Sequence, residues 1–324
     1  MRAIRVHRFG DPAELRLETI DPPVPGPGEA LVRVHAAGVN PVDTYIRSGA
    51  YARLPTLPYT PGFDGAGRIE AVGPGIEDLA PGDRVYIAGL GAEVRPGTYA
   101  ELVAAPRGTL HRLPDRLSFA QGAGIGVPYI TAAHALFGLA HLRPLDTVLV
   151  HGASGGVGLA CVQFARAFGA TVIGTAGSPE GRDLVRQHGA HHVVDHRTDG
   201  YARQIAAFTP RGGVDVIVEM LANVNLARDL ELLAPGGRLV IVGSRGSIEI
   251  NPRLIMAKDA RVTGTLLWNV SADEHARWHA LVSAGLQTGT LTPVVGREFP
   301  LEGAADAHRA VLEPGARGKI VLVP

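Results

Sequence analysis

The chain has 324 residues, a length that suits about two domains rather than one ordinary core. Its 31 basic and 31 acidic residues give a formal net charge of zero, which argues against a dominant role on nucleic acid or at a membrane surface. The single cysteine excludes an internal disulfide framework and a cysteine-based structural zinc site. No apolar run reaches the length of a membrane span, and we expect a cytoplasmic protein.

The first 120 residues or so read as β-rich. Pro- and Gly-containing turns separate short apolar or alternating runs, which predict strands over 3–6, 29–36, 65–72 and 84–87. This spacing is typical of a small irregular barrel. A helical linker is expected over 118–139, where Ser118 and Gln121 have the spacing of a capping box.

From about residue 146 strand and helix patterns alternate. The expected strands cover 147–151, 171–175, 192–195, 214–219, 238–242 and 261–267, and the expected helices 156–168, 181–188, 201–208 and 225–233. Repeated strand–helix units predict an α/β fold with a doubly wound parallel sheet. The remainder, with a helix over 272–284 and strands over 294–299 and 319–323, is expected to return to the first domain.

The most informative segment is the Gly-dense turn between the strand at 147–151 and the helix at 156–168. Its glycines would let the backbone approach a pyrophosphate, and the following helix would direct its N-terminus at the negative charge. The pattern departs from the plain G-x-G-x-x-G because Ala153 and Ser154 precede the glycine pair. Its strand–turn–helix context favours a dinucleotide site over a structural turn.

Five stretches, at 34–49, 57–62, 151–159, 219–225 and 241–246, make the whole chain resemble the medium-chain dehydrogenase/reductase superfamily. Within it the likeness is to the zinc-free quinone oxidoreductases, the branch that includes the ζ-crystallins. The resemblance implies a GroES-like domain over 1–122, a Rossmann domain over 123–266 and a return over 267–324. It also implies NADPH as the cofactor, a quinone as the substrate and a homodimer or homotetramer.

The zinc-dependent members of the superfamily carry a Cys and a His-Glu pair where this chain has Asn40 and Phe63-Asp64. Neither an amide nor a phenyl ring replaces a thiolate or an imidazole as a zinc ligand. We therefore expect no metal site.

The choice between NADH and NADPH depends on the end of the second Rossmann strand. An acidic residue there would hold the ribose 2′-hydroxyl of NAD, but this strand ends in Thr175-Ala176-Gly177-Ser178. Ser178, Arg182 and the His196-Arg197 pair suit a 2′-phosphate. A solvated surface charge is the other interpretation of Arg182. The missing acid, the nearby cations and the resemblance together favour NADPH.

The resemblance also implies the remaining cofactor contacts. Ser154, Gly155, Gly156 and Val157 would meet the pyrophosphate, and Gly177 and His196 would lie by the adenosine. The residues expected toward the nicotinamide are Asn225, Val242, Gly243, Ser244, Arg245, Thr265, Leu266 and Leu267. A plain β-turn is the alternative interpretation of 242–245, although its place after a buried strand favours a ligand-binding loop.

On the substrate side, the resemblance places Tyr45 beside the nicotinamide, where it would contact the cofactor and donate a hydrogen bond to the developing oxyanion. Asn40 would orient the substrate or the carboxamide. Tyr51, Tyr59 and Phe63 could line an apolar slot, although each aromatic taken singly is more often a core residue. Asp43 is either a buried base or a helix-capping residue.

Three functions remain open at this stage. The first is an NADPH-dependent quinone oxidoreductase. The second is an NADPH-dependent enone or 2-alkenal reductase, which delivers hydride to a related conjugated carbonyl. The third is an RNA-binding ζ-crystallin-like protein, which the neutral charge and the complete cofactor motif disfavour.

Overall fold

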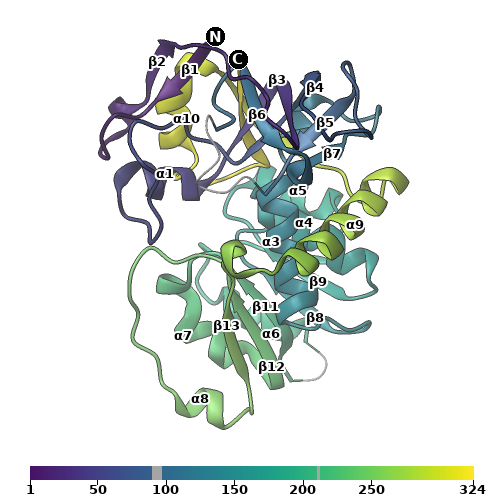
Figure 1. Cartoon of the computed structure of the whole chain (residues 1–324). Coiled ribbons are helices and arrows are strands. Elements are labelled where there is room, and N and C mark those ends of the chain that lie inside the picture. Colours follow the sequence, from purple (N-terminus) through teal and green to yellow (C-terminus); the bar gives the residue numbers. More distant parts are fainter. Residues whose placement is uncertain (90–96, 210–211) are drawn as a thin grey trace. The chain divides into compact units, whose positions relative to one another are not determined.

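The computed structural model describes residues 1–89, 97–209 and 212–324. Two compact units are present (Figure 1). The first unit contains residues 1–127, 293–313 and 318–324, and the second contains 128–292 and 314–317. None of the helices in the described ranges is long and apolar enough to cross a membrane.

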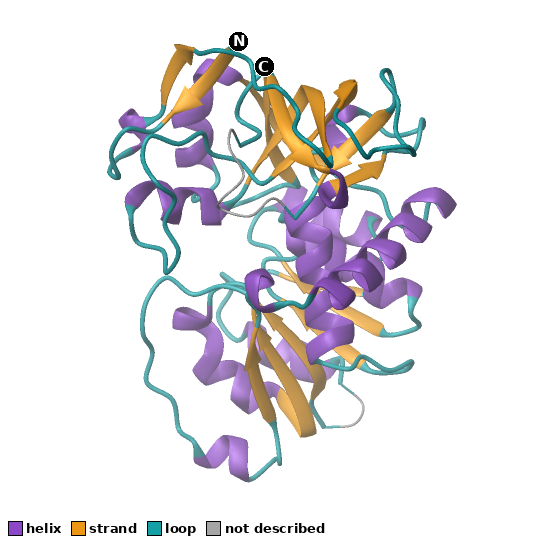
Figure 2. Ribbon diagram, viewed as in Figure 1, coloured by secondary structure: helices purple, strands orange, loops and turns teal. Residues whose placement is uncertain are grey.

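The second unit is built on a six-stranded parallel sheet with helices on both faces (Figure 2). Its strand order is β10-β9-β8-β11-β12-β13, formed by His192–Val194, Thr171–Thr175, Thr147–Val150, Val214–Glu219, Leu233–Ile241 and Arg261–Gly264. This is the order 3-2-1-4-5-6 of a Rossmann fold, and the expected doubly wound sheet is confirmed. The direction of winding reverses between β8 and β11.

Five helices lie between these strands along the described chain, and four fully buried side chains form a row across the sheet beneath two of them. The row is Leu149, Ile173, Ile217 and Leu239, one from each of four neighbouring strands in register. It packs against the apolar faces of α6 and α7 in one continuous core. The connecting helices are α4 (Gly156–Ala167), α5 (Pro179–Gln187), α6 (Tyr201–Ala207), α7 (Ala222–Leu232) and the short α8 (Arg253–Met256).

The first unit contains a seven-stranded sheet and a separate two-stranded sheet. Strand β3 (Glu29–Val39) organises the larger sheet, because its first half pairs with β6 (Leu102–Pro106) and its last residues pair with β15 (Lys319–Val323). Along its length it also pairs with β4 (Asp64–Val72). The sheet is completed by β5 (Arg84–Ile87), β7 (Leu110–Arg112) and β14 (Val295–Pro300), and β1 (Arg2–Arg5) pairs with β2 (Arg16–Thr19).

The expected linker helix is confirmed at its start and interrupted in its middle. The Ser118 hydroxyl accepts from the Gln121 N–H, and the Gln121 side chain accepts from the Ser118 N–H, so the capping box is present. Helix α2 (Phe119–Gly122) then ends, α3 runs over Gly126–Ala133, and a π-helix follows over His134–Leu139. A Cβ on Gly122 would lie 2.6 Å from that of Ala66, so this glycine permits close packing on β4.

The return to the first unit lies later in the chain than residue 267. Helix α9 (Ala272–Thr288) belongs to the second unit, where Trp278 contacts the rings of Phe137 and His134. The return starts at Pro293. Aromatic packing on residues distant in sequence decides the place of α9, and the helical periodicity of 272–284 carries no information about that partner.

Candidate functional site

The Gly-rich turn lies between β8 and α4, at the carboxyl end of the strand beside the switch point. Gly155 is the residue before the first turn of α4, and the N–H groups of that turn have no partner within the helix. A Cβ on Gly158 would lie 2.4 Å from the carbonyl oxygen of Gly152. The turn therefore folds back closely on the helix that it begins, and Ser154, Gly155, Gly156 and Val157 surround an N-terminus that suits an anion.

The residues expected around the adenosine are brought together at the ends of β9 and β10. A Cβ on Gly177 would lie 3.2 Å from the ring of His196 and 3.0 Å from Nε of Arg197. Ser178 caps α5 by accepting from the Gly181 N–H at 3.0 Å, so its hydroxyl oxygen also has a structural role. Burial lowers the pKa of His196.

Arg182 is not the free cation that the sequence suggested. It donates to Asp195 at 2.6 Å, and Arg197 reaches the same carboxylate at 3.4 Å. Asp195 follows β10, so examining only the end of the second strand missed it. Two guanidinium groups share one carboxylate, and the surrounding charge stays positive by one unit.

The loops expected toward the nicotinamide lie at the same edge of the sheet. The N–H of Val242 donates to the carbonyl of Glu219 at 2.8 Å, and that of Ala222 donates to the carbonyl of Gly243 at 2.9 Å. The backbone of Arg245 donates to Asn223. Residues 242–245 therefore form a loop joined to the end of β11 and the start of α7, rather than an isolated β-turn.

Directly after the last strand of the sheet, β13, come Thr265, Leu266 and Leu267. The N–H of Thr265 donates to the carbonyl of Ile241 at 2.9 Å, which brings this segment beside the end of β12. Its hydroxyl is buried and has no hydrogen-bond partner among the residues described. Leu266 is 37% exposed and Leu267 begins a short 3₁₀ helix.

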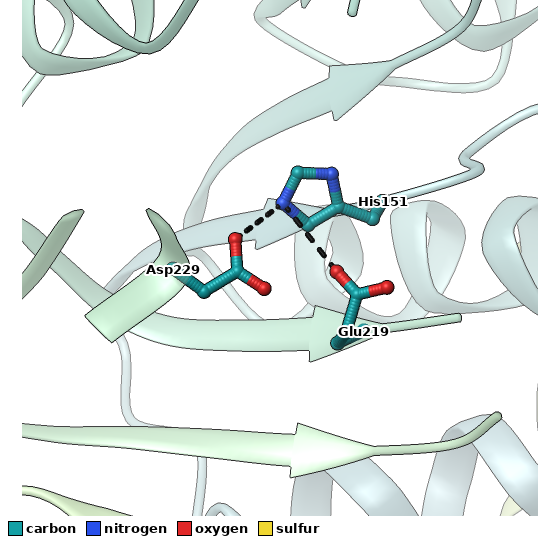
Figure 3. Close-up of side chains that lie close together, drawn as sticks. All are labelled: His151, Glu219 and Asp229. Carbon is teal, nitrogen blue, oxygen red and sulfur yellow. Dashed lines mark hydrogen bonds and ion pairs between the residues drawn. The ribbon is translucent and has the colours of Figure 1, made fainter. Parts of the chain in front are cut away.

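A buried cluster of three ionisable side chains lies at the switch point itself (Figure 3). His151 follows β8, Glu219 ends β11, and Asp229 comes from α7. The His151 Nε2 lies 2.9 Å from Asp229 and 3.7 Å from Glu219. The sequence analysis missed this cluster, because 78 positions of sequence separate His151 from Asp229.

Asn225 is held by this cluster. Its Nδ2 donates to both carboxylate oxygens of Glu219, at 3.1 and 3.2 Å. Asn225, the predicted nicotinamide contact, is thus held in place by Glu219, which was not among the predicted site residues.

In the first unit, Asn40 lies in a second buried polar network. Its Nδ2 donates to Asp64 at 2.9 Å, and Lys319 Nζ donates to the Asn40 side-chain oxygen and, at 2.9 Å, to Asp64. Both carboxylate oxygens of Asp64 are used, since the other accepts from the Val127 N–H at 2.8 Å. Lys319, one of only two lysines in the chain, is therefore a functional candidate that the sequence analysis missed.

Asp43 caps helix α1 (Pro41–Ser48), as the second of its two interpretations held. It accepts from the Asn40 N–H at 2.8 Å and from the Tyr99 hydroxyl at 3.1 Å. Burial raises the pKa of Asp43 to about 7. The Tyr99 hydroxyl also lies 3.2 Å from the Nε2 of His308. Burial lowers the pKa of His308 to about 3.

The predicted aromatic residues fall into two groups. Tyr45 on α1 is partly exposed, as are Tyr51 and Phe63. Tyr59 is 3% exposed, its backbone pairs with Val6, and its ring lies 6.4 Å from that of Phe9. Tyr59 thus packs inside the first unit, whereas the other three side chains retain a surface that a ligand can contact.

Comparisons with known proteins agree with this arrangement. A family model described as the alcohol dehydrogenase GroES-like domain matches residues 26–115, and one described as zinc-binding dehydrogenase matches residues 156–284. Quinone oxidoreductase from Pongo abelii is 50% identical over 325 residues, which cover 100% of this chain and 98% of the relative.

The chain belongs to the medium-chain dehydrogenase/reductase superfamily. It is an oxidoreductase. A solved NAD-dependent alcohol dehydrogenase matches with a TM-score of 0.93 and 32% identity, covering 100% of both chains. A mycobacterial protein solved in complex with NADPH matches with a TM-score of 0.89 and 32% identity, again over 100% of both chains.

We predict that Gly158→Ala disrupts the Gly-rich turn. The new methyl group would meet backbone atoms of Gly152 and Ala153, at 2.4 and 2.6 Å, which cannot move without distorting the turn. We expect a loss of about 1–3 kcal/mol in the free energy of unfolding, measured by urea denaturation. Dinucleotide affinity, measured by calorimetry, should fall at least about tenfold.

The matched control is Gly108→Ala, because a Cβ on Gly108 meets nothing within 4 Å. Gly158→Ala protein with wild-type stability and affinity would show that the turn does not depend on this close approach.

Proposed function

We propose that this protein is an NADPH-dependent quinone oxidoreductase that acts without a metal. The observation that supports this most strongly is the 50% identity, over the full chain, to a protein named quinone oxidoreductase. The residues at the carboxyl edge of the second unit add to it, because they form the surroundings that a dinucleotide requires.

Three features of this edge fit NADPH. Gly158 and Gly243 each leave room at a point where a Cβ would meet backbone within 2.6 Å, which permits close approach of the chain around a ligand. The buried hydroxyl of Thr265 has no partner among the residues described and suits a polar group of the cofactor. Arg182 and Arg197 outnumber Asp195 and favour a 2′-phosphate.

When bound, NADPH supplies the hydride or electrons, and the protein supplies position and polarity. Tyr45 donates a hydrogen bond to the quinone oxygen on which negative charge develops. Asn40 orients the substrate or the carboxamide, since Asp64 and Lys319 fix its amide from both ends. Tyr51 and Phe63 contact the planar ring, whereas Tyr59 packs against Phe9 within the first unit.

The ion pair between Lys319 and Asp64 supports the proposal that this chain acts without zinc. Asp64 follows Phe63 at the position where zinc-dependent relatives carry their His-Glu pair, and a buried carboxylate there needs a cation. The ammonium of Lys319 supplies that charge at 2.9 Å. The proposed role of the pair is to hold Asn40 in place without a metal ion.

We also propose a cytoplasmic homodimer or homotetramer. The edge strand β13 supports this proposal: it pairs with β12 on one side, and three of its four residues are exposed. An exposed edge strand is a ready template for pairing with a second copy.

The proposed activity is tested by following NADPH oxidation with a panel of quinones and, separately, a panel of 2-alkenals. We expect turnover with quinones to exceed that with alkenals and to be unchanged by EDTA, since Asn40 and Phe63 occupy positions of zinc ligands. Faster turnover of alkenals would identify an enone reductase instead. Stoichiometric zinc whose removal abolishes activity would contradict the metal-free mechanism.

NADPH should bind at least about tenfold tighter than NADH, a difference of about 1.4 kcal/mol. Arg182→Ala should reduce this preference, because it removes one cation and leaves Asp195 facing the 2′-phosphate with only Arg197. Arg186→Ala is the control on the same helix, where Arg186 pairs with Asp183 at 2.6 Å. Calorimetry that gives equal affinities in the wild type would refute the assignment.

Tyr45→Phe should lower kcat about fivefold, or about 1 kcal/mol, while NADPH affinity stays within about threefold. The phenyl ring keeps the packing, and only the hydrogen-bond donor is lost. Tyr86→Phe is the control, because the Tyr86 hydroxyl is buried with no hydrogen-bond partner among the residues described. Wild-type turnover of Tyr45→Phe with every quinone would make Tyr45 a packing or cofactor-contact residue.

A further inference from the structure

The cluster of His151, Glu219 and Asp229 lies where a dinucleotide would bind, but none of its members was predicted to contact the ligand. The three side chains are 0–3% exposed. One imidazole nitrogen and one oxygen from each carboxyl group all lie within 4.8 Å of one another. Two carboxyl groups and one imidazole share a space without water access. Such a group of charges is costly to bury unless protons balance it.

The cluster connects to the Gly-rich turn through Thr175. The His151 Nδ1 lies 3.3 Å from the Thr175 hydroxyl, which in turn accepts from the Gly152 N–H at 3.3 Å. The protonation state of His151 determines whether its Nδ1 donates to this hydroxyl or accepts from it. Two hydrogen bonds therefore join the cluster to the turn at Gly152.

The cluster connects equally to the loops on the other side. The Glu219 carboxylate accepts from the Asn225 side chain and from the Leu221 N–H, and its backbone carbonyl accepts from Val242. Two of these three residues are predicted cofactor contacts or directly adjoin them. A charge on Glu219 thus lies one residue away from the proposed ligand on this side as well.

Asp229 lies closer to the His151 imidazole, at 2.9 Å, and Glu219 is the more distant acid, at 3.7 Å. Burial lowers the pKa of His151, but the carboxylates of Asp229 and Glu219 outweigh burial and raise it overall. Burial, together with the negative charge of Asp229, raises the pKa of Glu219 to about 7. Ionisation of Glu219 makes the charge of the cluster more negative by one unit.

We propose that Glu219 takes up a proton when the anionic dinucleotide binds, so that the cluster it forms with His151 and Asp229 couples cofactor affinity to pH. The proposal rests on NADPH as the ligand of this edge. The negative phosphates of the bound ligand disfavour ionisation of Glu219, because like charges repel. Linkage then requires that protonation of Glu219 tightens binding of the ligand. Glu219 acts as a positioning residue, because it reaches the ligand through Asn225 and the loop at Val242.

Other charged groups face the cluster from neighbouring elements. The charge of Arg228 on α7 lowers the pKa of His151. The charge of His151 in turn lowers the pKa of His196, which follows β10. Arg228 stays charged across the neutral range and adds no step of its own. His196 is an imidazole whose pKa burial depresses, so it stays neutral above pH 7.

The experiment is calorimetric titration of the full-length protein with NADPH between about pH 7 and 9, in two buffers of different ionisation enthalpy. In this range the 2′-phosphate of NADPH, with a phosphate pKa near 6, is already ionised. We expect uptake of up to about one proton per NADPH, and a Kd that rises with pH with a limiting slope of about tenfold per unit.

Glu219→Gln mimics the protonated acid and keeps a carbonyl oxygen for Asn225 and Leu221. We expect it to bind NADPH at pH 9 with the affinity that the wild type shows at pH 7, without proton uptake. The matched control is Asp43→Asn, because Asp43 is another buried carboxyl group whose pKa burial raises to about 7. This control should retain the proton uptake.

If Glu219→Gln does not fold, Asp229→Asn provides the second variant, since removal of the neighbouring charge should move the pH dependence to lower pH. Proton release on binding to the wild type, or binding without proton uptake, between pH 7 and 9 overturns the inference and leaves the proposed function intact. Absence of NADPH binding at any pH overturns both. Stoichiometric zinc that is lost in His151→Ala would show a metal site instead and overturn the inference.

A readout without cofactor gives an independent test. The pKa of Glu219 is higher in the folded chain than the ordinary 4.5, so its stabilising contribution is present at low pH and is lost as the pH rises through about 7. The melting temperature of wild type relative to Glu219→Gln should therefore fall from pH 5 to 8. A constant difference contradicts the assignment of the proton to Glu219.

Discussion

The parallel direction of the strands in the second unit is the constraint on which its site depends. Each strand is followed by a loop and a crossover helix, so every loop after a strand lies at the same edge of the sheet. Residues from six separate segments of the chain, between Ser154 and Leu267, therefore lie along one edge. The reversal of winding between β8 and β11 then separates the helices that leave this edge, and the cluster of His151, Glu219 and Asp229 lies at that point.

Much of this arrangement was predictable from the sequence because it depends on local patterns. The strands at 171–175 and 214–219 were predicted with the bounds that the structure shows, since each is a short apolar run between turns. The Gly-rich turn was recognisable because glycine spacing, a preceding strand and a following helix lie within about 20 residues. Ser118 was recognisable as a helix cap for the same reason.

The parts that the sequence did not reveal depend on contacts between distant residues. Strands β2, β6 and β7 were not expected. Strand β7 has only three residues, and β6 is a strand because it pairs with β3, about 70 residues away in the sequence. Asp195 lies beside Arg182 only because β10 pairs with β9. Lys319 meets Asn40 across 279 positions of sequence, and no local pattern could have indicated that contact.

The two units balance buried charge in a similar way. In the first, Asp64 and Asp43 share one cation, Lys319, and in the second, Glu219 and Asp229 share one imidazole. In each network one carboxylate contacts the cation directly, at 2.9 Å, and the other has a pKa raised to about 7. A buried cation stabilises one carboxylate at contact distance, whereas burial disfavours a second negative charge.

The two surplus acids differ in what surrounds them. Asp43 accepts from the Asn40 N–H and the Tyr99 hydroxyl with one oxygen, and its other oxygen has no hydrogen-bond partner among the residues described. Glu219 instead bonds groups that join two loops of the proposed cofactor site. Asp43 thus caps a helix, whereas a proton on Glu219 changes the charge near the proposed ligand. The same electrostatic rule gives one unit a structural group and the other a group that responds to binding.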